Sequence, residues 1–291
     1  MVGKIIKNIS NDYTVDSNGN IFVCKVRGKI RTLDIKPLVG DNVVFDDKNN
    51  YIMEILPRKN FLNRPPISNV DQAFVITSVK EPDFSSNLLD KLLNIIEFNN
   101  IEPIICFTKL DLLNETELKR IEDIIKYYKS IGYKVFSNTE LDKINSLFKD
   151  KVSVFTGQSG AGKSTLLNNL DNKLNIKTNE ISKALGRGKH TTRHTELLNI
   201  SGGLVADTPG FSSLDMRDMT KSDIRDNMIE FNKYRDLCLY KDCMHDNEDD
   251  CEIKRQIGIN ILPSRYDNYI KFIKGDNNEN ISFNIKFKRK K

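Results

Sequence analysis

The sequence predicts an α/β protein in which a mostly parallel sheet is preceded by a small β-barrel and followed by a helical metal-binding segment. Short strands between turn residues fill roughly the first 60 positions. From about Asp71, apolar strands alternate with amphipathic helices, a pattern typical of a parallel sheet. Three cysteines and a histidine then cluster within charged helical sequence. We expect a barrel domain at 1–63, an α/β domain at 64–220 and a helical metal-binding domain at 221–291.

Turn residues punctuate the N-terminal strands. Asp16 to Gly19 are expected to form a hairpin turn, and Gly28 and Gly40 interrupt the strands that follow. Short strands of this spacing fit an OB-like barrel, although other small barrels share the pattern. Residues 57–71 contain two adjacent prolines and are expected to form a linker.

The central segment alternates between buried strands and longer helices. The expected strands cover 73–79, 102–107, 133–136 and 151–157, with two more between 197 and 207, and the expected helices cover 85–100 and 114–130. Because helices separate the strands, both faces of the sheet should be covered. From about Lys221 the sequence is helical and charged, with little apolar material for a core of its own. Pro263 fits the first turn of the last helix.

The composition fits a soluble globular protein. Of 291 residues, 38% are hydrophobic and 29% charged, and the net charge of +5 permits a nucleic-acid partner without requiring one. No apolar run is long enough to span a membrane, and the first residues lack the pattern of a secretory signal. We therefore expect a cytoplasmic protein without membrane contact, most simply a monomer. The basic run at 284–291 fits a solvated tail and a contact with a phosphate backbone equally well.

A phosphate-binding loop is the clearest motif. The sequence GQSGAGKS at 157–164 has the required glycine, four residues and Gly-Lys-Ser, between an apolar strand and an amphipathic helix. In such loops the lysine, here Lys163, reaches the β- and γ-phosphates, and the hydroxyl of Ser164 ligates Mg²⁺. The expected nucleotide-binding residues here are Gly157, Gln158, Ser159, Gly160, Ala161, Gly162, Lys163, Ser164 and Thr165.

A second nucleotide motif is expected at Asp207-Thr-Pro-Gly210. As a lone tetrapeptide it is a common turn, but here it follows an apolar strand downstream of the phosphate loop. A carboxylate at Asp207 can hold Mg²⁺, and the N–H group of Gly210 can reach the γ-phosphate.

A guanine-reading motif is expected at Thr108, Lys109, Leu110 and Asp111. The Asp111 carboxylate would accept both N1–H and the exocyclic N2–H of guanine, and the Lys109 stem would pack over the ring. Taken alone, Asp111 fits equally well as the cap of the next helix, but a phosphate loop in the same sheet favours guanine binding. Ser137 and Asn138 follow the next strand, where a backbone contact to guanine O6 is expected.

The order of these motifs indicates a circular permutation. A conventional GTPase places its phosphate loop before its guanine motif, whereas here the guanine motif at 108–111 precedes the phosphate loop at 157–164. A parallel sheet can be cut and rejoined at surface loops without a change in packing. The predicted fold is therefore a circularly permuted P-loop GTPase domain that binds GTP and GDP.

The basic segment 186–194 lies where a switch loop should be. One of its threonines should complete the Mg²⁺ shell with Ser164 and Asp207, and Thr192 is preferred to Thr191. Position 211 is phenylalanine, not the glutamine that orients the attacking water in Ras-like enzymes. His190 is the best local candidate for that role and His194 the second, although both also fit as surface residues of a basic loop.

The five cysteines do not form a disulfide framework. Cys24 and Cys106 lie in apolar strands and are expected to be buried. The others lie with one histidine at Cys238, Cys243, His245 and Cys251. Three thiolates and an imidazole at short spacing suit a closed, structural Zn²⁺ site.

Together these motifs resemble the RsgA (YjeQ/YloQ) family of bacterial GTPases that the small ribosomal subunit stimulates. The residues that carry the resemblance are 108–111, 157–164, 186–192, 207–211, the cysteine cluster at 238–251, and Arg265-Tyr266-x-x-Tyr269. It implies an N-terminal OB-fold, a permuted GTPase and a C-terminal zinc domain. It also implies rRNA binding and a late role in the maturation of the small (30S) ribosomal subunit. The family's water-positioning histidine falls on His190, and Thr108 replaces a more frequent asparagine.

Two other functions remain open from the sequence alone. One is a permuted GTPase that serves the large subunit, which the barrel and the zinc cluster argue against. The other is an RNA-binding zinc protein whose nucleotide site gates binding without turnover.

Overall fold

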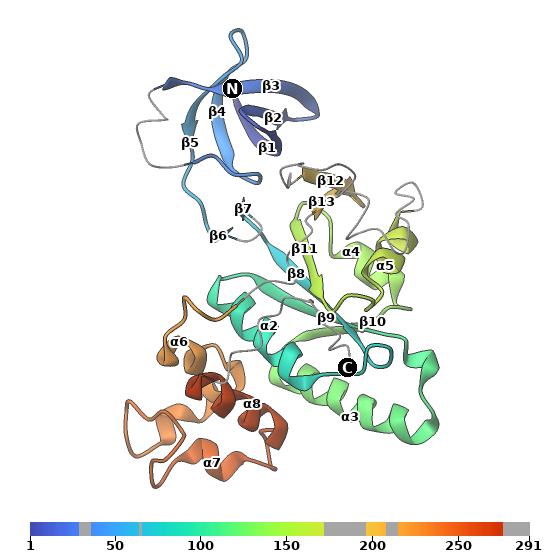
Figure 1. Cartoon of the computed structure of the whole chain (residues 1–291), viewed down its shortest axis with the longest axis vertical. Helices are drawn as coiled ribbons and strands as arrows, with labels where there is room; N and C mark the ends of the chain where they lie inside the picture. Colours follow the sequence, from blue (N-terminus) through green and yellow to red (C-terminus); the bar gives the residue numbers. More distant parts are fainter. Residues whose placement is uncertain (29–35, 64–65, 172–195, 208–214, 276–291) are drawn as a thin grey trace, which may run out of the picture.

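The computed structural model describes residues 1–28, 36–63, 66–171, 196–207 and 215–275. A barrel lies at one end, an α/β layer in the middle, and the C-terminal helices pack beside the α/β layer (Figure 1). Among the described helices, none combines the length and the apolar character needed to cross a membrane.

The N-terminal part is a closed five-stranded barrel. Its strands run in the order β1-β2-β3-β5-β4, and β1 also pairs with β4, so an OB-like barrel is confirmed. The strands are β1 Val2–Ile9, β2 Asp12–Ser17, β3 Asn20–Val26, β4 Asn42–Asp46 and β5 Tyr51–Ile55. Asn18 and Gly19, both with positive φ, form the predicted hairpin turn. Cys24 is buried inside the barrel, as expected.

The expected linker is a packed joint. Strands β6 (Phe61–Asn63) and β7 (Pro66–Ser68) form a hairpin within it. The buried Asp41 carboxylate accepts hydrogen bonds from Arg58 at 2.7 and 2.8 Å and from the Ser68 hydroxyl at 2.6 Å. The sequence alone did not indicate this, because Asp41 and its partners lie on separate segments. Asp41, which directly precedes β4, is thus joined to the hairpin through Ser68 and to the segment before the hairpin through the partly buried Arg58.

The α/β layer is a sheet with strand order β10-β9-β8-β11-β13-β12. Only β12 is antiparallel to its neighbour in this layer. The strands are β8 Gln72–Ser78, β9 Glu102–Thr108, β10 Lys134–Ser137, β11 Val152–Gly157, β12 Glu196–Ile200 and β13 Gly203–Asp207. The permuted order is visible directly, because β11, which feeds the phosphate loop, follows β8 to β10 in sequence yet lies between β8 and β13.

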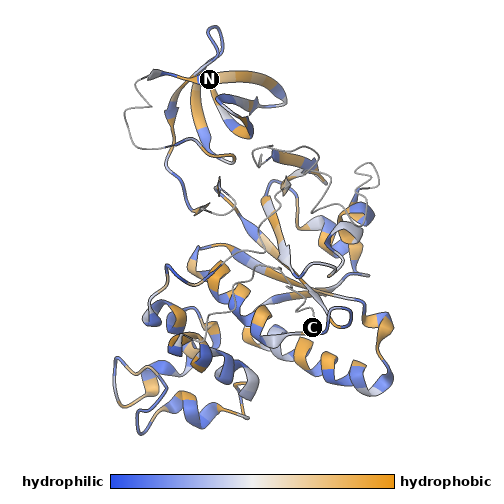
Figure 2. Cartoon of the chain, viewed as in Figure 1, coloured by the Kyte–Doolittle hydropathy of each residue, from blue (hydrophilic) through white to orange (hydrophobic). Residues whose placement is uncertain are grey.

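Helices cover both faces of this sheet, as predicted. One core contains Val75, Ile105 and Phe107 with residues of α2 and α3, and the other contains Phe74 and Cys106 with residues of α4 and α5. The helices are α2 Ser86–Phe98, α3 Glu115–Ile131, α4 Leu141–Ser146 and α5 Lys163–Leu170, and a 3₁₀ turn, η1, covers Leu110–Leu112. Hydrophobic and hydrophilic residues alternate along α2 and α3, in keeping with one buried face (Figure 2).

The C-terminal part consists of short helices that share a core with the α/β layer. They are α6 Lys221–Asp226, η3 Ile229–Lys233, η4 Arg235–Leu237, α7 Glu252–Gln256 and α8 Pro263–Lys274. The helical stretch expected from Lys221 is thus divided into one α-helix and two 3₁₀ turns. Phe231, Tyr269 and Phe272 are buried in the same apolar cluster as Leu89 and Leu93 of α2. The segment therefore packs against α2 and does not rely on a core of its own.

A buried ionic network fastens α8 to the α/β layer. Arg265 binds both carboxylate oxygens of Glu230 at 2.6 and 2.8 Å and the Asp90 carboxylate of α2 at 2.7 Å. Asp90 also accepts hydrogen bonds from the Tyr128 hydroxyl of α3 at 2.5 Å and the Asn268 amide at 2.7 Å. All five side chains are almost fully buried. The charges are therefore paired and hydrogen-bonded within the protein, as burial requires.

Replacement of Arg265 by methionine should destabilise the protein by about 3–5 kcal/mol, because it leaves two buried carboxylates without their cation. Urea unfolding followed by circular dichroism measures the loss. Arg255→Met is the matched control, since Arg255 pairs with Asp250 and Glu252 at the surface. It should cost less than about 1 kcal/mol. Equal losses in the two variants would contradict a central role for Arg265.

Candidate functional site

The phosphate loop joins β11 to α5 at the carboxyl edge of the sheet. Gly157, Gly160 and Gly162 all have positive φ. A Cβ atom on Gly157 would lie 2.0 Å from the carbonyl oxygen of Ile76 in β8. Glycine is therefore required at 157 by both the backbone conformation and the neighbouring strand.

Lys163, the first residue of α5, points back over this loop. Its ammonium group donates to the carbonyl oxygens of Gly157 at 2.8 Å and Gln158 at 2.6 Å. Burial lowers the pKa of Lys163 to about 8. Ser164 follows in the buried first turn of α5. The loop thus places a cation and a hydroxyl beside the N-terminus of a helix, an arrangement that suits phosphate binding.

The segment 108–111 lies directly against this loop. The Thr108 hydroxyl, at the end of β9, donates to the carbonyl oxygen of Ala161 at 2.7 Å. Lys109 has a left-handed backbone with φ of 62°, and Leu110 and Asp111 belong to η1. Asp111 is exposed to solvent. Thr108 therefore links segment 108–111 to the phosphate loop.

Ser137 and Asn138 lie beside that segment. Strand β10 runs parallel to β9 with Ser137 opposite Phe107, and the Asn138 N–H donates to the Phe107 carbonyl at 2.9 Å. The Glu140 carboxylate accepts from the Ser137 N–H at 2.9 Å. The structure thus gathers the predicted segments 108–111, 137–138 and 157–165 at one edge of the sheet, where ligands of open α/β sheets bind.

Of the remaining predicted nucleotide, magnesium and water-positioning residues, the structure describes only Asp207. Asp207 ends β13, which runs parallel to β11. Gly210, the threonines Thr191 and Thr192, and the histidines His190 and His194 lie outside the described residues, as does the basic run at 284–291.

One element of this edge carries no sequence motif. Residues 79–85 connect β8 to α2 and lie beside both loops. The Lys109 ammonium donates to the Glu81 carbonyl, and a Cβ atom on Gly160 would lie 3.8 Å from Pro82. Only the position of the segment, directly after a buried parallel strand, could have indicated its proximity to the site.

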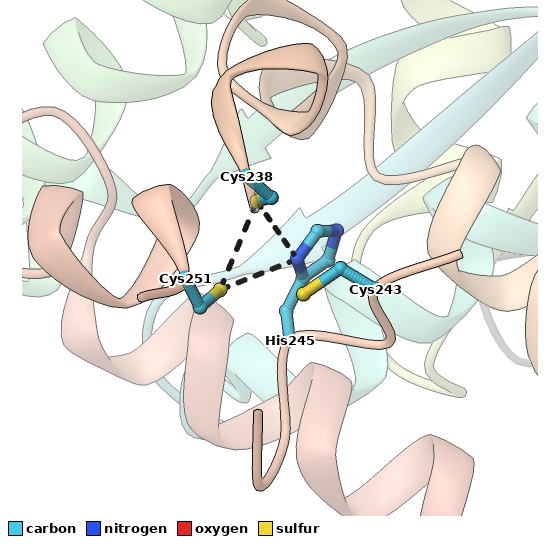
Figure 3. A group of neighbouring side chains, drawn as sticks. All are labelled: Cys238, Cys243, His245 and Cys251. Carbon is cyan, nitrogen blue, oxygen red and sulfur yellow. Dashed lines mark hydrogen bonds between the residues drawn. The ribbon is translucent and has the colours of Figure 1, made fainter. Parts of the chain in front are cut away.

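Cys238, Cys243, His245 and Cys251 converge on one point (Figure 3), and their ligand atoms all lie within 4.8 Å of one another. The Cys238 sulfur lies 4.0 Å from that of Cys251, and His245 Nδ1 lies 3.7 and 3.4 Å from these two sulfurs. Around a tetrahedral metal with bonds of about 2.3 Å, ligand atoms are separated by about 3.8 Å. The four side chains therefore fit a tetrahedral metal centre and could hold a metal ion.

The pKa values of His245 and Cys243 are also compatible with metal binding. Burial lowers the pKa of His245 to about 4 and raises the pKa of Cys243 to about 12. The imidazole is therefore neutral, as a ligand must be, while the buried thiol needs a nearby cation to ionise.

Helix α8 supports the metal-binding loop. The Tyr266 hydroxyl donates to the His245 carbonyl at 2.6 Å, and the Tyr269 hydroxyl donates to the Met244 carbonyl at 2.5 Å. His245 itself has a positive φ of 59°. Because Arg265 of the same helix binds Asp90, the Arg-Tyr-x-x-Tyr sequence connects the metal-binding loop to α2.

Loss of one ligand should release the metal. Cys243→Ser should lower the bound metal from about one ion per chain to near zero and reduce stability by about 2–5 kcal/mol, because metal binding contributes to folding. Elemental analysis by mass spectrometry and urea unfolding measure the two effects. Cys24→Ala, in the barrel, is the control and should keep its metal. A Cys243→Ser protein with a full metal complement would show that the cluster is not the site.

Two family models match the chain. The RsgA N-terminal domain matches residues 2–52, and the RsgA GTPase matches residues 55–217. The small ribosomal subunit biogenesis GTPase RsgA 2 of Oceanobacillus iheyensis is 49% identical over 93% of this chain and 96% of its own length. The corresponding RsgA of Enterococcus faecalis is 44% identical, over 93% and 94%.

Solved structures agree with these matches. The crystal structure of YloQ, a circularly permuted GTPase, aligns with a TM-score of 0.81 at 38% identity and covers 94% of each chain. YjeQ from Thermotoga maritima aligns with a TM-score of 0.79 at 31% identity, covering 94% of this chain and 97% of its own. Together with the permuted sheet and the motifs at its edge, these similarities show that this chain belongs to the RsgA GTPase family.

Proposed function

We propose that this protein hydrolyses GTP to GDP and phosphate as a late-stage biogenesis factor of the small (30S) ribosomal subunit, binding rRNA and being stimulated by the ribosome. The observation that supports this best is the contact of the phosphate loop with segment 108–111, through Thr108 and Ala161, in the permuted order. Relatives named as small ribosomal subunit biogenesis GTPases, 44–49% identical over nearly the whole chain, support the assignment to that subunit.

In this proposal the carboxyl edge of the sheet holds the nucleotide. Residues 157–165 surround the phosphates, and Lys163 moves from the carbonyls of its own loop to the β- and γ-phosphates. Asp111 reads the guanine edge, Lys109 packs over the ring, and the backbone at 137–138 approaches guanine O6. Gly210 contacts the γ-phosphate.

Hydrolysis then depends on residues around the γ-phosphate. Mg²⁺, when bound, neutralises phosphate charge, and Ser164, Thr192 and Asp207 would hold it. His190 positions the attacking water, because position 211 is phenylalanine and cannot orient it. Lys163 and the backbone N–H groups of the loop stabilise the charge that develops in the transition state.

The metal centre is assigned to one structural Zn²⁺ ion held by Cys238, Cys243, His245 and Cys251. Three sulfur ligands and one nitrogen favour zinc, and four protein ligands, three of them buried, complete a tetrahedral shell without a position for a substrate. We divide the chain into a barrel domain at 1–63, a GTPase domain at 64–220 and a zinc-binding domain at 221–291. We further propose that the protein is a cytoplasmic monomer.

The GTPase rate with and without ribosomal subunits tests the proposed function. Purified small subunits should raise the rate at least about tenfold, because the sequence offers no glutamine at position 211 to orient the attacking water and turnover of the protein alone should be slow. Lys163→Ala should abolish the stimulated rate. Stimulation by large subunits alone would favour a role in their assembly, and subunit binding without turnover would favour an RNA-binding protein. Either result would overturn the proposal.

The same assay includes His190→Ala. The stimulated rate should fall by about 100-fold if this histidine orients the water, while GDP affinity stays unchanged. A variant with intact stimulated turnover would refute the role of His190.

The affinity for GDP should depend on pH through Lys163. The phosphates of GDP bind the protonated amine of Lys163. At any pH at which Lys163 is deprotonated in the nucleotide-free protein, binding must therefore take up a proton. Because the pKa of free Lys163 is about 8, the dissociation constant should be flat below pH 7.5. It should then rise by up to about tenfold per pH unit from 8 to 9.

Fluorescence titration with a labelled GDP measures this dependence. Lys163→Arg keeps its charge across the range and should show a flatter profile, although its affinity is lower. A flat wild-type profile would mean that Lys163 remains protonated in the free protein.

A further inference from the structure

The segment 79–85 and the guanine motif leave the sheet side by side. Strands β8 and β9 are parallel neighbours, with Ser78 opposite Thr108. The Val79 N–H donates to the Thr108 carbonyl at 3.2 Å, so the pairing continues one residue beyond the end of β8. The rings of Phe84 and Phe107 lie 5.9 Å apart behind this contact. The two loops therefore start from a common, packed base.

Each loop then sends one lysine to the other. Lys80 donates to the Leu112 carbonyl at 3.3 Å and pairs with the Glu117 carboxylate at 3.3 Å. Lys109 donates in the opposite direction to the Glu81 carbonyl. Glu81 has a positive φ of 55°, which places it among the uncommon left-handed residues of the chain. The two segments are thus connected by two lysine contacts, one donated by Lys80 to the guanine motif side and one donated by Lys109 to segment 79–85.

Lys80 binds the turn that carries Asp111. Asp111 is the middle residue of the 3₁₀ turn Leu110–Leu112, and Lys80 donates to the carbonyl of Leu112, its last residue. Among the described residues, no hydrogen bond from another protein group restrains the Asp111 carboxylate. Its position therefore depends on the backbone of the turn.

Glu117 anchors the second contact of Lys80. Its carboxylate accepts from the Asn114 N–H at 3.0 Å, and the Asn114 side chain accepts from the Glu117 N–H at 2.9 Å. This reciprocal capping fixes the start of α3. Lys80 therefore joins the Asp111 turn to a rigid helix end.

We infer that the segment 79–85 is a third wall of the guanine site and that Lys80 is a positioning residue that holds Asp111 in the geometry needed to read guanine. This inference rests on the proposed function. The Asp111 carboxylate can accept from N1–H and from the exocyclic amine only if its two oxygens face both donors at once. A loosened turn loses the second contact first, because the pair of contacts demands an orientation that a single hydrogen bond does not.

Inosine diphosphate isolates that second contact, since hypoxanthine keeps N1–H and lacks the exocyclic amine. The wild-type protein should bind GDP about 10- to 100-fold more tightly than IDP, the range expected for a hydrogen bond to a charged group. In Lys80→Met the dissociation constant for GDP should rise about five- to tenfold, while that for IDP changes less than about twofold. The GDP-to-IDP preference should therefore fall by about the same five- to tenfold factor.

Two variants separate this role from a general loss of structure. Lys126→Met is the matched control, because Lys126 lies on the exposed side of α3 and pairs only with Asp123 among the described residues. It should leave both affinities unchanged. Lys80→Arg keeps a donor and a charge and should restore most of the preference. If Lys80→Met fails to fold, Lys80→Gln carries the same expectation.

Isothermal titration calorimetry with GDP and IDP decides the outcome. An unchanged GDP-to-IDP preference in the folded Lys80 variant, or equal weakening of both ligands, would overturn the positioning role. A wild-type protein that binds GDP and IDP equally, or neither, would instead refute the guanine site itself. The two failures are therefore distinguishable in one experiment.

Discussion

The buried guanidinium of Arg265 joins the C-terminal segment, which has little apolar material for a core of its own, to the α/β layer. Short helices, 3₁₀ turns and a metal-binding loop make up the C-terminal segment, and none of them is long enough to be stable alone. Arg265 connects η3 through Glu230 to α2 through Asp90. Tyr266 and Tyr269, one and four residues further along the same helix, donate hydrogen bonds to carbonyl groups of the loop that carries His245. One helix thus carries both the buried ion pairs of Arg265 and the hydrogen bonds that support the cysteine–histidine cluster.

The ion pairs of Arg265 are also connected to the carboxyl edge of the sheet, because α2 carries Asp90 and begins at that edge. Ser85 caps α2 at its N-terminus and is the last residue of the segment beside the guanine motif. Asp90 lies little more than one turn further along. Through this helix, the metal-holding segment is fixed relative to the carboxyl edge of the sheet. At the other end, the buried Asp41 carboxylate connects the barrel to the β6–β7 hairpin through Ser68 and to the preceding segment through the partly buried Arg58. The parts of the chain are therefore joined by buried charges as well as by apolar packing.

The carboxyl edge of the sheet shows why the permuted order still brings the motif segments together. The contact between Thr108 and Ala161 depends on β9, β8 and β11 lying next to one another, and not on which strand comes first in the chain. Parallel strands end at a common edge whatever their order, so loops from distant sequence positions meet there.

The sequence by itself determined the main strands and helices of the α/β layer, the sheet class and the motifs, because these depend on local patterns. Short strands between turn residues in the first 60 positions marked the barrel, apolar runs such as 102–107 marked the parallel strands, and the spacing at 238–251 marked the candidate metal ligands. Tertiary structure alone decided the partners of Asp41, Lys80 and Arg265, each of which is an ordinary charged residue in sequence. Their roles arise from groups 17 to 175 positions away. No local pattern encodes such a partner, because burial and pairing are set only when the chain has folded around them.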